Sequence, residues 1–117
     1  MVLTMHELSV TENLLEIALR HAQQANAKRI IRLHLVVGQL SSIIDDSVNF
    51  YWDIIAKGTI AETAELEFRR IPATFECLDC HTQYIPESDH YECSHCNSAN
   101  VRLIKGQEFF LESMDVE

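Results

Sequence analysis

The feature that most constrains this chain is the spacing of its cysteines. All four fall in two Cys-x-x-Cys pairs, Cys77–Cys80 and Cys93–Cys96, and twelve residues separate the pairs. Two residues between thiolates let both sulfurs of one turn face the same ion, and two such turns complete a tetrahedron around zinc. The spacing therefore predicts a zinc site whose ligands are Cys77, Cys80, Cys93 and Cys96. Structural turns without a metal, or a redox disulfide, are the alternatives.

A site with four protein ligands leaves no open position for water, so the predicted zinc is structural and not catalytic. Residues 74–105 are poor in apolar side chains, and such an insert folds only if the metal contributes to its folding energy. The chain has no signal-peptide pattern and no apolar run of the roughly 20 residues that a bilayer requires. We therefore expect a soluble cytoplasmic protein without a membrane partner, in which the thiols stay reduced.

Hydrophobic periodicity predicts the rest of the fold. Apolar residues at helical spacing indicate a helix from about Ser9 to Asn26, with a Ser-x-x-Glu capping box at Ser9 and a similar Thr-x-x-Glu pattern at Thr4. The other expected elements are a strand over 29–37, a helix capped by Asp45 or Asp46 and ended by Gly58, a strand over 65–71 and a strand over 107–116. A strand–helix–strand crossover makes the first two strands parallel.

These elements predict an α/β (α+β) protein. Two helices lie on one face of a small three-stranded sheet, and a zinc-ribbon-like domain with four cysteine ligands is inserted before the last strand. The expected boundaries are residues 1–73 and 106–117 for the α/β domain and 74–105 for the zinc-binding domain.

The charge of the chain restricts its partners. Eighteen acidic residues against nine basic ones give a net charge of −9, and only Arg102 and Lys105 are basic within 77–105. Such a surface repels a phosphate backbone, so we expect no nucleic-acid binding. The sequence contains no evident nucleophile–base set, phosphate loop or open metal site, so we expect a binding protein and not an enzyme.

A second candidate site lies near the N-terminus. Met5-His6-Glu7 falls in, or just before, the first turn of the first helix, and an imidazole there is a competent ligand for a divalent ion. The plainer interpretation is the polar start of an ordinary helix.

Four stretches together carry a resemblance to a known family: Met5-His6-Glu7-Leu8-Ser9, Val37-Gly38-Gln39-Leu40-Ser41, Ala64-Glu65-Leu66, and the doubled Cys-x-x-Cys. In this order they resemble the HypA/HybF family, the nickel metallochaperones of [NiFe]-hydrogenase maturation. The similarity extends from Met5 to the terminal strand.

The resemblance implies two metals with different roles. His6 is the expected key nickel ligand, with Met5 and Glu7 beside it, while the four cysteines hold structural zinc. Nickel is cargo, passed toward the large subunit of [NiFe]-hydrogenase together with a GTPase partner of the HypB type, and some members also serve urease. The alternative is a zinc-ribbon interaction module without nickel transfer. The chain is expected to be a monomer or a homodimer, since exchange of the insert between copies is conceivable.

The chain departs from the family at its beginning. Four residues precede Met5, so an amine on Met1 lies five residues from His6 and cannot complete the same compact chelate. Three explanations stand: a start assigned upstream of a natural Met5, an addition made for expression, or a rearranged ligand set that uses backbone amides and no amine.

Two histidines lie beside the cysteines. His81 and His95 are either surface residues or imidazoles that replace a zinc thiolate as the pH falls. His21 and His34 are expected to be surface or packing residues.

Overall fold

The computed structural model describes residues 5–87 and 89–117. Its chain forms two compact units. The first, which we call the helical unit, comprises Met1–Val36, Ile43–Arg69 and Phe109–Glu117. The second, the cysteine unit, comprises Val37–Ser42 and Arg70–Glu108.

The first helix of the helical unit, α1, spans Met5–Gln24 and so begins earlier than Ser9. The Ser9 capping box is therefore not used as a helix start. Inside the helix, the Thr11 hydroxyl donates to the carbonyl oxygen of Glu7 at 2.6 Å, a bond back to the preceding turn that satisfies a buried hydroxyl. Thr4, the other predicted cap, lies outside the described residues. The early start places His6 and Glu7 in the first helical turn.

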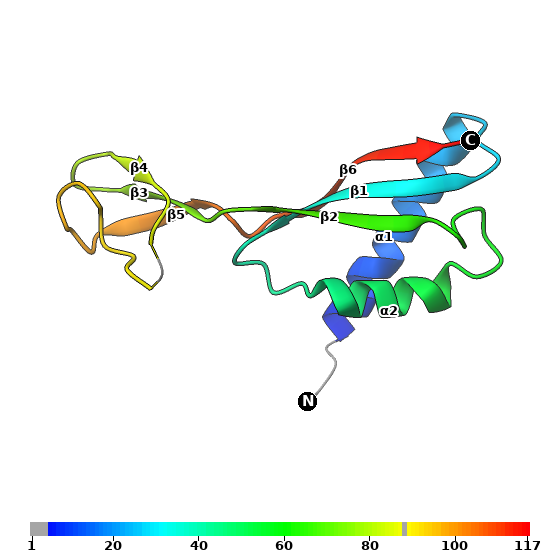
Figure 1. The fold of residues 1–117 in the computed structure, drawn as a ribbon, viewed down its shortest axis with the longest axis horizontal. Helices are drawn as coiled ribbons and strands as arrows, with labels where there is room; N and C mark the ends of the chain where they lie inside the picture. The colour runs from blue at the N-terminus through cyan, green and yellow to red at the C-terminus, as the bar shows by residue number, and fades with distance from the viewer. Residues whose placement is uncertain (1–4, 88) are drawn as a thin grey trace. The chain divides into compact units, whose positions relative to one another are not determined.

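The sheet contains β1 (Ile30–Gly38), β2 (Glu65–Ile71) and β6 (Phe109–Val116) in the order β2-β1-β6 (Figure 1). Arg29 and Glu117 exchange backbone hydrogen bonds, and the Gly38 N–H donates to Glu108, so β1 and β6 are antiparallel. Between β1 and β2, residue numbers instead increase in the same direction along both strands: Arg32 contacts Glu65, and Gln39 contacts Ile71. These two strands run in the same direction, as the predicted crossover requires.

The second helix, α2, spans Asp45–Ile55. Its N-cap is Ile44, which makes no side-chain cap hydrogen bond, and Asp45 and Asp46 lie in the first turn. The prediction that one of these aspartates is the cap was wrong, because the chain enters the helix one residue earlier. Both acids still face the positive end of the helix dipole. Gly58, beyond the end of α2, adopts φ +80°, a conformation that glycine accepts readily.

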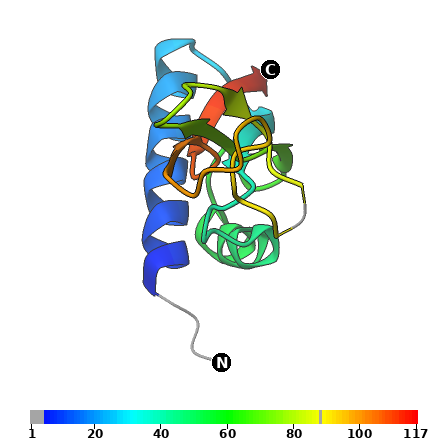
Figure 2. The ribbon, with the colours of Figure 1, turned by 90° about the vertical axis from the view of Figure 1, so that its left-hand side faces the viewer.

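The two helices pack on one face of the sheet and against each other (Figures 1 and 2). Their shared core contains Leu14, Ala18 and Ala22 of α1, Leu33 and Leu35 of β1, and Val48 and Trp52 of α2. The opposite face of the sheet carries ion pairs of Arg32 and His34 with acidic residues of β2 and β6. Among the described residues, no helix is long and apolar enough to span a bilayer.

The cysteine unit is a second three-stranded sheet. Its strands are β3 (Thr74–Cys77), β4 (Gln83–Tyr84) and β5 (Val101–Lys105), and β3 lies in the middle, antiparallel to both neighbours. Residues 37–42 belong to the same unit, where Gly38 approaches Gly106 so closely that a Cβ on Gly38 would lie 2.1 Å from the Gly106 carbonyl carbon.

Candidate metal centres

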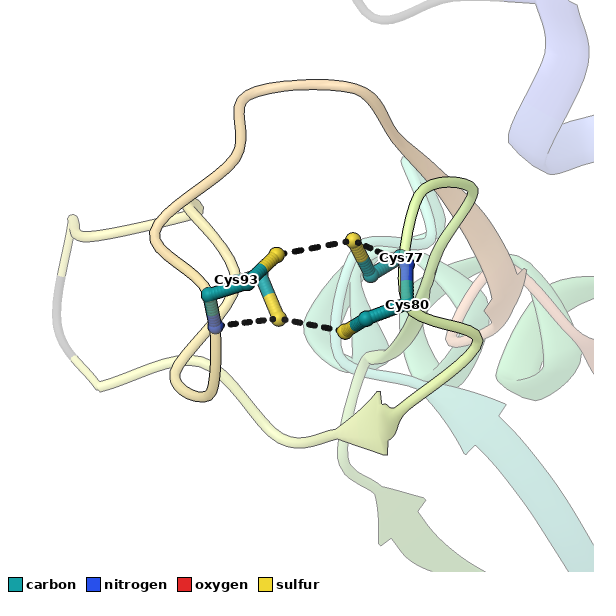
Figure 3. Close-up of side chains that lie close together, drawn as sticks. Cys77, Cys80 and Cys93 are labelled. Carbon is teal, nitrogen blue, oxygen red and sulfur yellow. Dashed lines mark hydrogen bonds between the residues drawn. The ribbon is translucent and has the colours of Figure 1, made fainter.

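The four cysteine sulfurs meet at one end of the cysteine unit. The Sγ atoms of Cys77 and Cys96 lie 3.5 Å apart, those of Cys80 and Cys93 lie 3.6 Å apart, and all four lie within 4.8 Å of one another. Figure 3 shows Cys77, Cys80 and Cys93 close together. None of the cysteines forms a disulfide. The structure thus brings together the whole set that the spacing predicted, as free thiols.

Two short turns present these sulfurs, and they have nearly the same construction. We call residues 77–82 the first knuckle and 93–98 the second knuckle. In each, the residue after the second cysteine, His81 or Asn97, adopts φ near +65° (65° and 64°) and donates its N–H to the carbonyl of the first cysteine at 2.9 Å. This left-handed residue turns the chain so that both sulfurs of a knuckle face the same point.

Backbone amides of the knuckles also point at sulfur. The amide of Cys80 approaches Cys77 Sγ at 3.5 Å, and the amides of His95 and Cys96 approach Cys93 Sγ at 3.3 and 3.4 Å. N–H groups placed in this way favour thiolates over thiols. These N–H groups stabilise negative charge on the sulfurs even without a bound ion.

The thiols differ in how readily they ionise. Cys80 Sγ lies 3.2 Å from the Thr82 hydroxyl, whose hydrogen bond lowers the pKa of Cys80 to about 6. A hydrogen bond from the Ser98 backbone acts in the same direction on Cys96, but hydrogen bonds with the other three cysteine sulfurs, together with burial, outweigh it and raise the pKa of Cys96 to about 12. Four thiolates this close repel one another, so a cation is needed to hold all four charges.

The geometry fits zinc. A tetrahedral ion with Zn–S bonds of about 2.3 Å requires sulfurs about 3.8 Å apart. The separations of 3.5 and 3.6 Å are close to that value, and Cys77 and Cys93 are buried at 0% and 2% exposure. The cluster is therefore suited to a structural zinc ion.

Sequence reasoning missed the residues that join the two knuckles. The Asp79 carboxylate accepts a short hydrogen bond from the Ser98 hydroxyl and a second one, at 3.2 Å, from the Asn100 side-chain amide. These two bonds, the one from Ser98 first, hold the pKa of Asp79 below its ordinary value. The only signal in the sequence was a run of small polar residues after Cys96, which is typical of any turn.

A ring cluster lies beside the sulfurs. Phe75 stacks on Tyr84 at 6.2 Å and meets the edge of Tyr91 at 5.5 Å, and the Tyr84 hydroxyl donates to the carbonyl of Tyr91. Among the described residues, the buried members of this cluster are Cys77, Tyr84 and Cys93. Such a small core leaves most of the stability of the unit to the metal site.

The histidines near the cysteines are exposed. His81 supplies the left-handed turn of the first knuckle, and His95 contributes its backbone amide to Cys93. These backbone roles are independent of the imidazoles, so exchange of a histidine for a thiolate stays a prediction.

The predicted N-terminal site lies in the first turn of α1. Met5 and His6 begin the helix, and their side chains lie outside the described part of the structure. Glu7 is described, and only 6% of it is exposed although it is an acid. A carboxylate in the first helical turn is stabilised by the positive end of the helix dipole. The arrangement of the three side chains around an ion stays a prediction.

The fold and the cysteine cluster define a class: small α+β proteins that carry an inserted, zinc-ribbon-like four-cysteine unit. A family model described as "Hydrogenase/urease nickel incorporation, metallochaperone, hypA" matches residues 5–116. The chain belongs to this HypA family of nickel metallochaperones.

Individual relatives cover nearly the whole chain. It is 44% identical to the hydrogenase maturation factor HypA of Dehalococcoides mccartyi over 97% of this chain and 95% of the relative. It is 37% identical to the factor of the same name from Caldanaerobacter subterraneus, over 97% of this chain and 100% of the relative.

Solved structures agree with the fold. The solution structure of the Ni metallochaperone HypA from Helicobacter pylori matches with a TM-score of 0.67 at 26% identity, over 94% of this chain and 96% of that one. A second solution structure of a HypA protein matches with a TM-score of 0.77 at 26% identity, over 97% and 98%.

Proposed function

We propose that this chain binds one Ni(II) ion at the start of α1 and carries it to a nickel enzyme under assembly, the large subunit of [NiFe]-hydrogenase. The observation that carries the proposal is the family match, which begins at Met5 and therefore includes Met5-His6-Glu7. The hydrogenase maturation factors among its relatives indicate the recipient.

We assign the nickel to His6 as the principal ligand, with Met5 contributing through its backbone and Glu7 as a neighbouring carboxylate. Imidazole nitrogen suits Ni(II), and ionised backbone amides favour a planar arrangement. The burial of Glu7 supports a positioned carboxylate in this turn, where it can offset the charge of the ion. A site at a helix end, with few protein ligands, releases its ion more readily than a closed cage, which is what a carrier needs.

The second metal has a different role in this proposal. Zinc bound by Cys77, Cys80, Cys93 and Cys96 stabilises the fold of residues 74–105, and it stays in place when nickel is transferred. Residues 1–73 and 106–117 form the nickel-binding domain. The support for this division is chemical, because the clustered sulfurs suit tetrahedral zinc and the N-terminal turn offers nitrogen and oxygen.

The nickel carrier works by binding and release without turnover. A GTPase of the HypB type would act with it on the recipient, and the reduced state of the four thiols suits the cytoplasm.

The test is complementation of a host strain that lacks this gene. Wild-type chain should restore nickel to the hydrogenase large subunit, whereas His6→Ala should leave it nickel-free, and excess nickel in the medium should partly restore that variant by mass action. His21→Ala is the matched control, because His21 is an exposed histidine near the other end of the same helix. Normal nickel incorporation by His6→Ala would refute the assignment.

A further inference from the structure

The two knuckles are joined by a bridge of side chains that no zinc ligand takes part in. Asp79 lies between the two cysteines of the first knuckle, and its carboxylate binds Ser98 and Asn100, which lie at and just beyond the end of the second knuckle. The bridge is closed within itself, since the Ser98 hydroxyl also accepts the Asn100 backbone N–H at 3.0 Å. A backbone bond of 2.8 Å from the Leu78 N–H to the Asn100 carbonyl runs alongside it. We call Asp79, Ser98 and Asn100 the knuckle clamp.

A chain that handles nickel has to keep it away from its own four thiolates. Intrinsic affinities do not accomplish this, because nickel and zinc are close together in the order of divalent metal affinities. Coordination geometry separates the two ions instead. Four sulfurs in a tetrahedron suit zinc, whereas Ni(II) with strong ligands favours a square plane.

The two geometries demand different distances between the knuckles. In a tetrahedron at a bond length of about 2.3 Å, every pair of sulfurs lies about 3.8 Å apart. In a square plane at the same bond length, two pairs move out to about 4.6 Å and the other four close to about 3.3 Å. The observed contacts that cross between knuckles, Cys77–Cys96 and Cys80–Cys93, are 3.5 and 3.6 Å. These distances lie between the values of the two geometries, so the requirement for a turn comes from the arrangement of the ligands. Each knuckle supplies two sulfurs. The two pairs are crossed in a tetrahedron but lie in one plane in a square, so flattening the cluster requires one knuckle to turn against the other.

We propose that the knuckle clamp is a positioning element that holds the two knuckles in tetrahedral register and so keeps cargo nickel out of the zinc site. The proposal rests on the proposed zinc site and adds the residues that make it selective. The three side chains of the clamp bond to one another and not to sulfur, and they act by fixing how the first knuckle is turned relative to the second.

The experiment compares zinc exchange and nickel intrusion in zinc-loaded full-length protein. Exchange with isotopically labelled zinc is followed by mass spectrometry. Nickel entry at sulfur is followed by the charge-transfer absorption of a nickel–thiolate centre under excess Ni(II). Asp79→Ala should speed zinc exchange by about tenfold, a typical effect of losing an outer-shell partner, and should allow the nickel–thiolate band to appear. Asp79→Asn keeps one carbonyl acceptor and should be intermediate.

Two further variants separate the clamp from a simple effect of charge. Ser98→Ala with Asn100→Ala keeps the Asp79 carboxylate but removes its partners, and it should reproduce Asp79→Ala. Asp89→Ala is the matched control, because Asp89 is an exposed acid of the same unit that takes no part in the clamp. It should behave as wild type.

The outcomes are distinct. If the wild-type chain holds no zinc, the proposed zinc site fails. If it holds zinc and Asp79→Ala exchanges zinc and excludes nickel as the wild type does, the clamp fails. An effect of Asp79→Ala without the same effect in the Ser98/Asn100 variant would also overturn the proposal, since charge alone would explain it. Should Asp79→Ala not fold, Asn100→Ala alone loses one of the two side-chain bonds and carries the test.

Discussion

Trp52 occupies the centre of the helical unit and is the only tryptophan in the chain. It is 1% exposed, and within the described part of the structure its indole Nε1 has no hydrogen-bond partner. A buried N–H without a partner carries a desolvation cost. Trp52 therefore stabilises the fold mainly by filling volume in the core, and not through its indole N–H.

This predicts a large difference between two substitutions at Trp52. Trp52→Phe removes the unpaired N–H together with some volume and should cost less than about 1.5 kcal/mol. Trp52→Ala leaves a cavity and should cost about 3–5 kcal/mol. Urea unfolding followed by far-ultraviolet circular dichroism measures both. Equal losses would mean that the indole N–H has a partner that matters.

Asp115 belongs to the ion pairs on the face of the sheet opposite the helices, and it shows how the stability they contribute depends on pH. Its carboxylate lies 3.0 Å from His34 Nε2 and 3.5 Å from Arg32 Nη1. The hydrogen bond with His34, helped by both positive neighbours, holds the pKa of Asp115 below its ordinary value. A depressed folded-state pKa contributes stability above the unfolded pKa of about 3.9.

We therefore expect Asp115→Asn to lower the urea midpoint at neutral pH and to lose this difference as the pH falls through the folded-state pKa. The group is exposed, so the effect should be small and should shrink in high salt. A difference between the two proteins that grows below about pH 3 would contradict the assignment.

At the scale of elements, the end of β1 can approach the backbone at Gly106 only because position 38 is a glycine. A Cβ at Gly38 would meet the Gly106 backbone at 2.1 Å, and backbone atoms cannot move aside as a flexible side chain can. Gly58 differs, because no described atom lies within 4 Å of a Cβ built there, and its φ of +80° is what opposes a side chain.

Gly38→Ala should therefore cost about 3 kcal/mol or more, as an overpacked site does when the backbone has to shift. Gly58→Ala should cost only about 1–2 kcal/mol, the strain of a left-handed residue with a Cβ. Thermal unfolding of the zinc-loaded proteins gives the comparison. If both substitutions cost the same, the close approach of Gly38 to Gly106 is not a constraint.

The strands of the helical unit were predictable because burial on one side of a sheet imposes a period of two. Leu66 and Phe68, two residues apart on β2, both pack inward, and β2 has the predicted bounds of Glu65–Ile71. The start of α1 was not predictable from local signals, because two capping patterns, at Thr4 and Ser9, are equally good by sequence. The prediction of the α2 cap was wrong for a related reason. Asp45 and Asp46 favour a helix start, but an aspartate inside the first turn is also stabilised by the helix dipole.

The clustering of the four cysteines could be predicted because knuckle spacing is itself geometric. Their supports could not. Asp79, Ser98 and Asn100 come together only once the two knuckles face each other, and nothing in the local sequence encodes that pairing. The nickel ligands His6, Met5 and Glu7 remain predictions from the family resemblance.

At the scale of the whole molecule, the two units differ in what stabilises them. Among the described residues, the core of the helical unit contains eleven buried residues, whereas the buried cluster of the cysteine unit contains Cys77, Tyr84 and Cys93. Two of these three residues are proposed zinc ligands, so we expect this cluster to lose its packing when the metal is removed.

Removal of zinc with a strong chelator should therefore unfold the cysteine unit and leave the helical unit folded. Trp52 fluorescence reports the helical unit and should keep its blue-shifted maximum, while amide exchange in residues 74–105 should become fast. Re-addition of zinc should reverse the change. Full unfolding of both units on chelation would show that the core around Trp52 is not independent of the metal.

The most direct test of the account counts both metals in the same samples. Wild-type protein and His6→Ala are loaded with Ni(II), passed through a desalting column and analysed for nickel and zinc per chain. We predict one nickel and one zinc in the wild type, and in His6→Ala no nickel with the zinc unchanged. Nickel retained by His6→Ala in full, or nickel gained only where zinc is lost, would contradict the claim that the two ions occupy separate sites.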